Sequence, residues 1–175
     1  MFVRPSELVE QFGINRGDRI VDCGSGNGTF TLLMAERVGR EGEIIALDVQ
    51  KPLIESVIRE AEYRDIMHVT GFVVDIERLH SVPLKDGVAD MCLLANVLFQ
   101  MDDKKTGIRE SVRLLKSGGK LIVIEWRDAF GGIGPHPSHI IPEEDVHVLC
   151  DEVGLLYETS IDAGSYQYGV IFTKL

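Results

Sequence analysis

The sequence predicts an α/β fold: a doubly wound, mostly parallel seven-stranded sheet with an antiparallel last strand and helices on both faces. Two observations lead to this prediction. From Asp18 onward, short apolar runs alternate with segments of helical period, as expected of parallel strands joined by crossover helices. Near the end of the chain, two strand-like segments are separated only by residues 162–165, a connection too short for a crossover between parallel strands.

Five apolar runs predict the first five strands, at residues 19–21, 44–47, 72–74, 91–95 and 121–124. Three crossover helices are predicted from apolar residues at helical spacing. The first of these helices precedes Gly39, the second follows Pro52, and the third includes Leu115 and precedes Gly118.

Two further helices and two further strands complete the predicted fold. Pro5 begins a short leading helix, and a later helix over about 142–153 has acidic residues near its positive end and stops at Gly154. Residues 155–161 and 166–174 form the last two strands, the last of which runs antiparallel. The chain has 175 residues, 45% of them hydrophobic, which suits one core, so we expect a single domain over 1–175.

Composition narrows the classes of partner. The net charge of -10 repels phosphate backbones, so we expect no nucleic acid partner. No apolar run approaches the roughly 18 residues of a bilayer span, and the amino terminus lacks the pattern of a secretory signal. We therefore expect no membrane partner and a cytoplasmic location. Cys23, Cys92 and Cys150 stand far apart in apolar surroundings and read as buried apolar residues rather than disulfide partners.

Polar side chains stand at the carboxyl ends of all five apolar runs: Asp22, Asp48, Asp75, Asn96 and Glu125. In an open parallel sheet these ends share one edge, which is where ligands bind. The alternative for each residue is a turn or helix-capping role. In the same way, Asp102 and Asp103 are interpreted as caps of the following helix rather than as metal ligands.

The first of these ends opens a glycine-rich turn that leads into a helix. Gly24, Gly26 and Gly28 allow close backbone approach by a ligand, and the free amides at the helix start suit an anion. The third glycine of the dinucleotide fingerprint is replaced by Thr29, which disfavours a nicotinamide or flavin enzyme.

Residues 22–28 resemble the first motif of the class I S-adenosylmethionine-dependent methyltransferases, and the similarity extends through nearly the whole chain. The nearest likeness is to small type 11 methyltransferases and quinone-pathway C-methyltransferases. The resemblance implies a Rossmann-like fold and S-adenosylmethionine as cofactor. It implies that Asp48 holds the ribose hydroxyls, that Asp75 and Ile76 meet the adenine, and that residues 95–98 lie beside the methionine part. The cofactor-binding residues expected are Asp22, Gly24, Ser25, Gly26, Asp48, Val49, Asp75, Ile76, Ala95 and Asn96.

The expected reaction is in-line transfer of the methyl group to a small-molecule acceptor, which needs alignment in a dry pocket and not necessarily a catalytic side chain. If a base is used, the candidates are His136 and His139 in the Gly- and Pro-rich stretch 126–141, which suits a lid. Their alternative is solvated loop histidines, and two histidines without further ligands define no metal site, so we expect none. Phe99, Trp126 and Phe130 are candidates for an acceptor pocket, with packing at the edge of the core as the alternative.

Two other functions remain open from the sequence. One is a catalytically silent protein that keeps the S-adenosylmethionine site. The other is a nicotinamide-dependent oxidoreductase, favoured by Gly24-Ser25-Gly26 but opposed by Thr29, Asp75 and the antiparallel end. A homodimer is compatible with the small chain and its thinly covered pocket.

Overall fold

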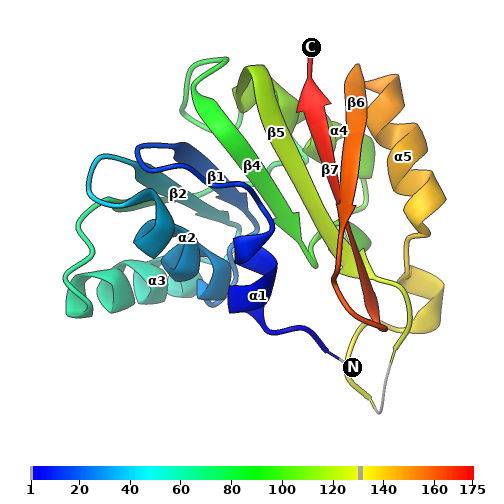
Figure 1. The fold of residues 1–175 in the computed structure, drawn as a ribbon, viewed down its shortest axis with the longest axis horizontal. Helices are drawn as coiled ribbons and strands as arrows, with labels where there is room; N and C mark the ends of the chain where they lie inside the picture. Colours follow the sequence, from blue (N-terminus) through cyan, green and yellow to red (C-terminus); the bar gives the residue numbers. More distant parts are fainter. Residues whose placement is uncertain (1, 130–131) are drawn as a thin grey trace.

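The computed structural model describes residues 2–129 and 132–175, whose strands form one seven-stranded sheet in the order β3-β2-β1-β4-β5-β7-β6 (Figure 1). Strand β7 pairs antiparallel with both β5 and β6, and the other pairings are parallel. The predicted fold class, with its antiparallel last strand, is confirmed. The strands are β1 (Arg19–Cys23), β2 (Glu43–Asp48), β3 (Val69–Val73), β4 (Ala89–Ala95), β5 (Leu115–Trp126), β6 (Leu155–Ile161) and β7 (Gln167–Lys174).

Five α-helices and two short 3-10 turns connect the strands in the described part of the chain. Their bounds are α1 (Pro5–Glu10), α2 (Thr29–Val38), α3 (Lys51–Tyr63), η1 (Leu98–Gln100), α4 (Lys104–Leu114), η2 (Pro137–His139) and α5 (Glu143–Glu152). Every predicted helix is present. Asp103 caps α4 by accepting a hydrogen bond from the backbone N–H of Thr106, as the capping interpretation required.

Two predicted boundaries are wrong. Helix α4 ends at Leu114, not near Gly118, because Leu115 pairs with Ala89 and begins β5. Strand β3 covers Val69–Val73 instead of 72–74, because its backbone pairs with β2 from the first of these residues onward. The polar Thr70 broke the apolar pattern there without breaking the strand.

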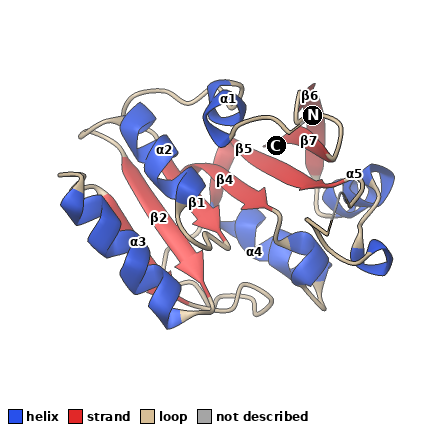
Figure 2. Cartoon of the chain, turned by 90° about the horizontal axis from the view of Figure 1, so that it is seen from below, coloured by secondary structure: helices blue, strands red, loops and turns tan. Residues whose placement is uncertain are grey.

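Helices cover both faces of the sheet, and each face has its own hydrophobic cluster. One cluster includes residues of α1, α2 and α3, such as Leu8 and Val57. The other includes residues of α4 and α5, such as Ile108 and Val146. Figure 2 looks onto the carboxyl ends of the parallel strands, between these helices. The doubly wound arrangement therefore leaves that edge open between the two layers.

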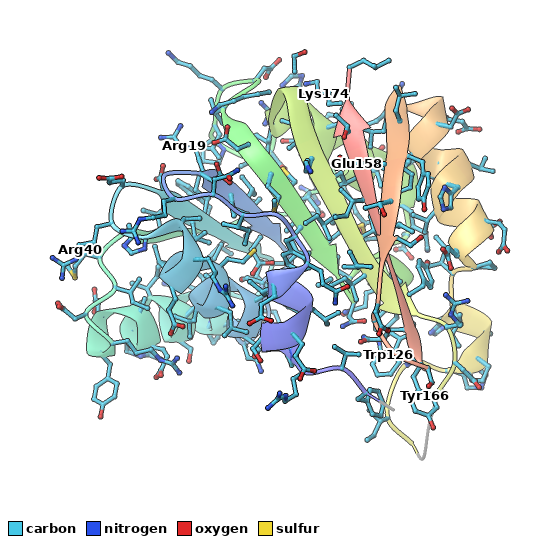
Figure 3. The ribbon with its side chains drawn as sticks, in the orientation of Figure 1. Arg19, Arg40, Trp126, Glu158, Tyr166 and Lys174 are labelled. Carbon is cyan, nitrogen blue, oxygen red and sulfur yellow. The ribbon has the colours of Figure 1, made fainter. Side chains whose placement is uncertain are left out.

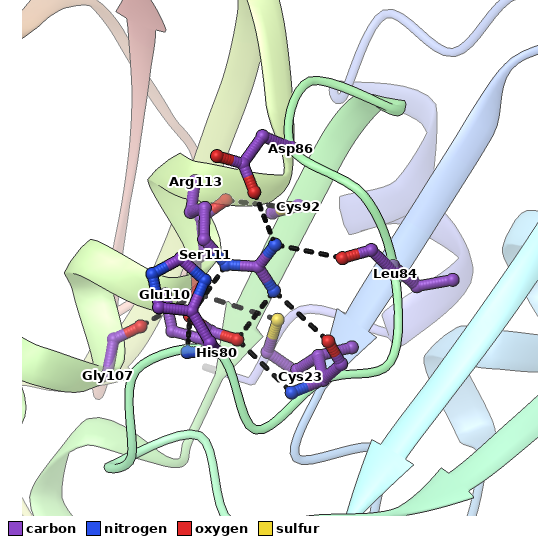
Figure 4. Close-up of polar contacts among 10 residues, drawn as sticks. Cys23, His80, Leu84, Asp86, Cys92, Gly107, Glu110, Ser111 and Arg113 are labelled. Carbon is purple, nitrogen blue, oxygen red and sulfur yellow. Dashed lines mark hydrogen bonds and ion pairs between the residues drawn. The ribbon is translucent and has the colours of Figure 1, made fainter.

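A buried ion pair fastens the segment before β4 to α4 (Figure 4). The guanidinium of Arg113 lies 2.7 Å from the carboxylate of Glu110 and 2.7 Å from that of Asp86. Arg113 also donates to the backbone carbonyls of Val82 and Leu84, and Glu110 accepts the N–H of Val82. Because both oxygens of Glu110 are hydrogen-bonded, the cost of burying its charge is offset.

The three cysteines are free and buried, as predicted. Burial raises the pKa of the Cys150 thiol to about 12, so this thiol stays protonated and unreactive. Across residues 2–129 and 132–175, no helix combines the length and apolar character that a bilayer crossing requires.

Candidate functional site

A cavity of about 510 Å³ opens at the carboxyl ends of the parallel strands. Its walls come from the ends of β1, β2, β3 and β4, which the sheet brings to one edge. All of the residues predicted to bind a cofactor line it: Asp22, Gly24, Ser25, Gly26, Asp48, Val49, Asp75, Ile76, Ala95 and Asn96. The volume is within the range of small-molecule and cofactor sites. We call this cavity the cofactor cavity.

The glycine-rich turn between β1 and α2 needs glycine for steric reasons. Gly24 has φ +81°, and a Cβ atom on it would stand 2.5 Å from Cγ2 of Val97. Gly28 has φ +79°, and a Cβ atom there would stand 2.6 Å from Cγ2 of Val57. The turn therefore packs its backbone directly against the loop after β4 and against α3.

Asp48 connects the end of β2 to this turn. Its Oδ2 accepts the N–H of Gly26 at 3.0 Å, and its Oδ1 accepts the N–H of Gln50 at 2.9 Å. A carboxylate has about four acceptor positions, so these two bonds orient the group and leave further positions for hydroxyl donors in the cavity. Asp48 is half-buried on the cavity wall, as expected of a residue that holds a polar part of a ligand.

Asp22, near the end of β1, contacts the helix that follows the glycine-rich turn. Its carboxylate is buried and accepts a 2.6 Å hydrogen bond from the hydroxyl of Thr31 in the first turn of α2. Burial raises the pKa of Asp22 to about 6, and the bond from Thr31 opposes the rise. This hydrogen bond connects the end of β1 to the first turn of α2, across the glycine-rich turn between them.

Asp75 and Ile76 form the end of the cavity beyond β3. Both carboxylate oxygens of Asp75 have partners within its own turn: the N–H of Glu77 at 3.0 Å and the guanidinium of Arg78 at 3.2 Å. The turn role that was weighed for Asp75 is thus present in addition to its place on the cavity wall. Ile76 is 7% exposed and presents an apolar surface there.

Asn96 is held in an unusual conformation at the end of β4. Its φ of +56° is rare for a non-glycine residue, and its N–H donates to the carbonyl of Ile124. Its side-chain oxygen lies 2.7 Å from Nε2 of Gln167, a buried residue at the start of β7. Sequence reasoning missed Gln167. The pattern of a strand does not show which distant side chain the strand will contact, and Gln167 and Asn96 are 71 residues apart.

The hydroxyl of Ser25 is the clearest sign that this cavity takes a ligand. Ser25 is 8% exposed and lines the cavity, yet its Oγ has no hydrogen-bond partner among the described residues. A buried polar group without a partner costs about 1–3 kcal/mol, which a bound polar ligand would recover. The hydroxyl of Ser25, the accepting carboxylate of Asp48 and the apolar wall at Ile76 together fit a nucleoside that carries an amino-acid tail.

Glu125 does not belong to the cavity, contrary to the expectation that all five strand-end residues share its rim. It is fully buried and accepts the N–H of Leu98 at 2.7 Å. Side chains alternate along a strand, and Glu125 shares the face of Leu121 and Val123, on the α4 and α5 side. Asp48 follows Ala46 on the opposite face. Alternation along the strands separates Glu125 from Asp22, Asp48 and Asp75, but only the packing of the fold shows which of the two faces borders the cavity.

A second cavity of about 700 Å³ adjoins the first, and Gln100 and Met101 line both. Phe99 and His139, predicted for the acceptor pocket and as a base, line this second cavity. His136 is exposed, lines neither cavity, and has Nδ1 2.8 Å from the hydroxyl of Ser138.

Trp126 also lines neither cavity. Its ring lies edge-on to Phe2 at 6.1 Å, and a Cβ atom on Gly134 would stand 2.9 Å from it. Figure 3 places Trp126 and Tyr166 at the lower end of the sheet, near the amino terminus. Trp126 follows Ile124 on the face covered by α1, α2 and α3, whereas Phe99 lines the second cavity beside α5, so the structure does not bring them together. Phe130 lies outside the described residues.

No group of three or more potential metal ligands occurs within 2–129 and 132–175. Several cavity residues could not be found from motifs, because they reach the site only through packing: Pro5 from α1, Phe30 from α2, Leu53 from α3, Gln100 from η1, and Glu77 and Met101 from loops.

Comparison with known sequences identifies the family. A family model described as a methyltransferase domain matches residues 14–153. The ubiquinone/menaquinone biosynthesis C-methyltransferase UbiE of Photorhabdus laumondii is 26% identical over 161 residues, which are 91% of this chain and 61% of that protein. The chain thus spans less than two thirds of that relative's length.

Solved structures agree on the fold. A SAM-dependent methyltransferase from Aquifex aeolicus is similar with a TM-score of 0.89 and 21% identity, over 99% of this chain and 91% of that one. A protein described as a type 11 methyltransferase from Sulfolobus solfataricus has a TM-score of 0.69 and 27% identity, over 89% of this chain and 82% of that one. The chain therefore belongs to the methyltransferase-domain family as a class I S-adenosylmethionine-dependent domain, distantly related to the UbiE C-methyltransferases and the type 11 methyltransferases.

Proposed function

We propose that this protein transfers the methyl group of S-adenosylmethionine, the methyl donor of its family, to a small-molecule acceptor. One observation carries the proposal: the residues that the family resemblance assigns to the cofactor all line one cavity, although they come from four separate strand ends. Parallel strands bring their carboxyl ends to one edge in any sheet of this order. The proposal therefore depends on the residue types at that edge, which match the family motif.

Asp48 is assigned to the ribose. A carboxylate that accepts both hydroxyls of a diol forms charge-assisted hydrogen bonds, each contributing on the order of 1.5 to 3 kcal/mol. The N–H groups of Gly26 and Gln50 fix its orientation before the ligand arrives. Such preorganisation reduces the ordering cost of binding.

The remaining wall residues are assigned from their position relative to Asp48. Val49 and Ile76 offer apolar surface for the adenine, beside Asp75. Gly24, Ser25 and Asn96 lie at the other end, where β1 and β4 finish, and are assigned to the methionine part. The hydroxyl of Ser25 would gain there the partner that it lacks within the described chain.

The chain's task in the reaction is alignment and exclusion of water. When bound, S-adenosylmethionine supplies the methyl group, carried on a sulfonium that needs no activation by a metal. Pro5 and Phe30 line the cavity near the methionine end, and we assign the approach of the acceptor to that side. Phe99, Trp126, His136 and His139 remain candidates for contact with the acceptor. Of the two candidate bases only His139 lines a cavity, and it is the second one, so His139 can act as the base only if the acceptor reaches the methyl group from the second cavity.

Binding of S-adenosylhomocysteine tests the cofactor assignment. At one hundred times its dissociation constant a ligand stabilises by about 2.7 kcal/mol, which raises the thermal midpoint of a chain of this size by roughly 5 to 11 °C. We expect this shift in the wild type and its loss in D48A. The matched control is D90A. Asp90 likewise accepts a backbone N–H, that of Arg19, but it stands at the opposite end of the sheet, so D90A should keep the shift.

Two results would contradict the proposal. If neither S-adenosylmethionine nor S-adenosylhomocysteine shifts the midpoint while NADH does, the protein is an oxidoreductase on this fold. If both sulfur ligands bind but labelled methyl never passes to any acceptor in a cell extract, the protein is a silent binding protein.

A further inference from the structure

Glu125 is a buried carboxylate that the proposed reaction leaves unused. It stands next to the end of β5, is 0% exposed, and forms no ion pair with any described residue. Instead it accepts backbone N–H groups, from Leu98 at 2.7 Å and from Trp126 at 3.3 Å. The first bond crosses 27 residues and ties the end of β5 to the turn that follows β4.

The turn held by Glu125, Leu98–Gln100, belongs to the wall between the two cavities. Val97 precedes it and contacts the glycine-rich turn so closely that a Cβ atom on Gly24 would overlap it. Gln100 and Met101 end it and line both cavities. Leu98 is the first residue of this turn, so the carboxylate of Glu125 holds the wall at the point where the turn begins.

Glu125 places a carboxylate where an apolar side chain would fill the same space at a lower free energy. Burying the charge costs free energy that an apolar side chain of similar volume would avoid, and a buried polar group is therefore a reason to look for a positioning role. Burial raises the pKa of Glu125 to about 7, while the N–H groups of Leu98 and Trp126 oppose the rise. Ionisation of Glu125 is therefore less favourable in the folded state than in the unfolded state, which lowers the stability of the fold near neutral pH.

We propose that Glu125 is a positioning residue for cofactor binding: its carboxylate anchors the turn Leu98–Gln100 and so sets the wall that separates the cofactor cavity from the second cavity. The inference rests on the proposed function, because it assumes that the cofactor cavity binds S-adenosylmethionine. It adds a residue that touches neither the cofactor nor the acceptor and acts through Leu98.

The test compares E125L with E125Q by titration calorimetry with S-adenosylhomocysteine, well below each variant's thermal midpoint. E125L removes both acceptors, and we expect its affinity to fall about tenfold, as for the loss of roughly 1.4 kcal/mol of binding. E125Q keeps one carbonyl oxygen for the N–H of Leu98 and should recover most of that affinity. Amide hydrogen exchange at Leu98 should be faster in E125L than in E125Q.

The matched control is E110Q. Glu110 is also fully buried and also accepts two loop N–H groups, from His80 at 2.9 Å and Val82 at 3.2 Å, but it lines neither cavity. E110Q should lower the thermal midpoint without changing the affinity for S-adenosylhomocysteine. A general loss of stability thus lowers the thermal midpoint of the variants at either glutamate. Only a positioning role also weakens the binding of S-adenosylhomocysteine.

Wild-type affinity in folded E125L overturns the inference. If E125L does not fold, the same titration is made with E125D, which keeps the charge but is one methylene too short to hold Leu98 in place. Weakened binding of S-adenosylhomocysteine by E125D supports the positioning role, and wild-type binding refutes it. Failure of the wild type to bind S-adenosylhomocysteine would instead refute the proposed function.

Discussion

Substituting Gly24 by alanine should separate backbone strain from steric overlap in the glycine-rich turn. At φ +81° a side chain costs about 1–2 kcal/mol, because Cβ approaches the following carbonyl. The added Cβ would also stand 2.5 Å from Cγ2 of Val97, well inside the usual carbon contact distance of about 3.5–4.0 Å. Overpacking of this kind costs about 1–3 kcal/mol, so G24A should lower the free energy of unfolding by about 2–5 kcal/mol.

Two companion variants give the two contributions separately. Gly26 has φ +52° and no atom within 4 Å of its Cβ position, so G26A should show only the strain of about 1–2 kcal/mol. In the G24A/V97A double variant the worst overlap is removed, and the combined loss should be smaller than the sum of the single losses by about 1–2 kcal/mol.

Urea denaturation of G24A, G26A, V97A and G24A/V97A, followed by circular dichroism, measures these values. The reasoning fails if G24A is no less stable than G26A, because the close approach to Val97 would then not exist. It also fails if the losses in G24A and V97A are additive, since independent sites add and sites in contact do not.

Two further predictions follow from buried charges. R113M leaves the 0% exposed Glu110 without its cation, so the free energy of unfolding should fall by about 3–5 kcal/mol and the thermal midpoint by roughly 6–20 °C; a change within error would mean that the pair contributes nothing. Burial raises the pKa of Glu125 to about 7, so its contribution to stability is present below the unfolded value of about 4.3 and is lost as pH rises through 7. E125Q should therefore show a flatter decline of unfolding free energy over that range, and a profile parallel to the wild type would refute the assignment.

The order and type of the secondary structure elements could be predicted because the local pattern carries them. Strands β1, β2 and β4 are apolar runs buried on both faces, and they read as continuous stretches that end at a polar residue. The errors came where backbone pairing overrode side-chain pattern. Thr70 and Gly71 are not apolar, yet their backbones complete β3, and Leu115 leaves the helical repeat to pair with Ala89.

That the candidate residues next to strand ends would share one cavity could be predicted, because parallel strands bring their ends together whatever else the chain does. The surroundings proposed for the acceptor could not be predicted, because residues from distant segments reach them only through packing. Pro5 comes from the leading helix, Gln167 from the last strand, and Phe99 lines the second cavity, which Trp126 does not.

The sequence by itself thus determined the fold class and the cofactor cavity, because periodicity, glycine positions and strand-end acids are local properties of the chain. Only the tertiary structure decided which polar side chains face that cavity and which lie behind it. Glu125 shows the difference: it stands beside the strand end as Asp48 does, but it points to the other face and binds Leu98. Which partner a buried carboxylate meets depends on the packing of segments distant in sequence, and that is set by the whole fold.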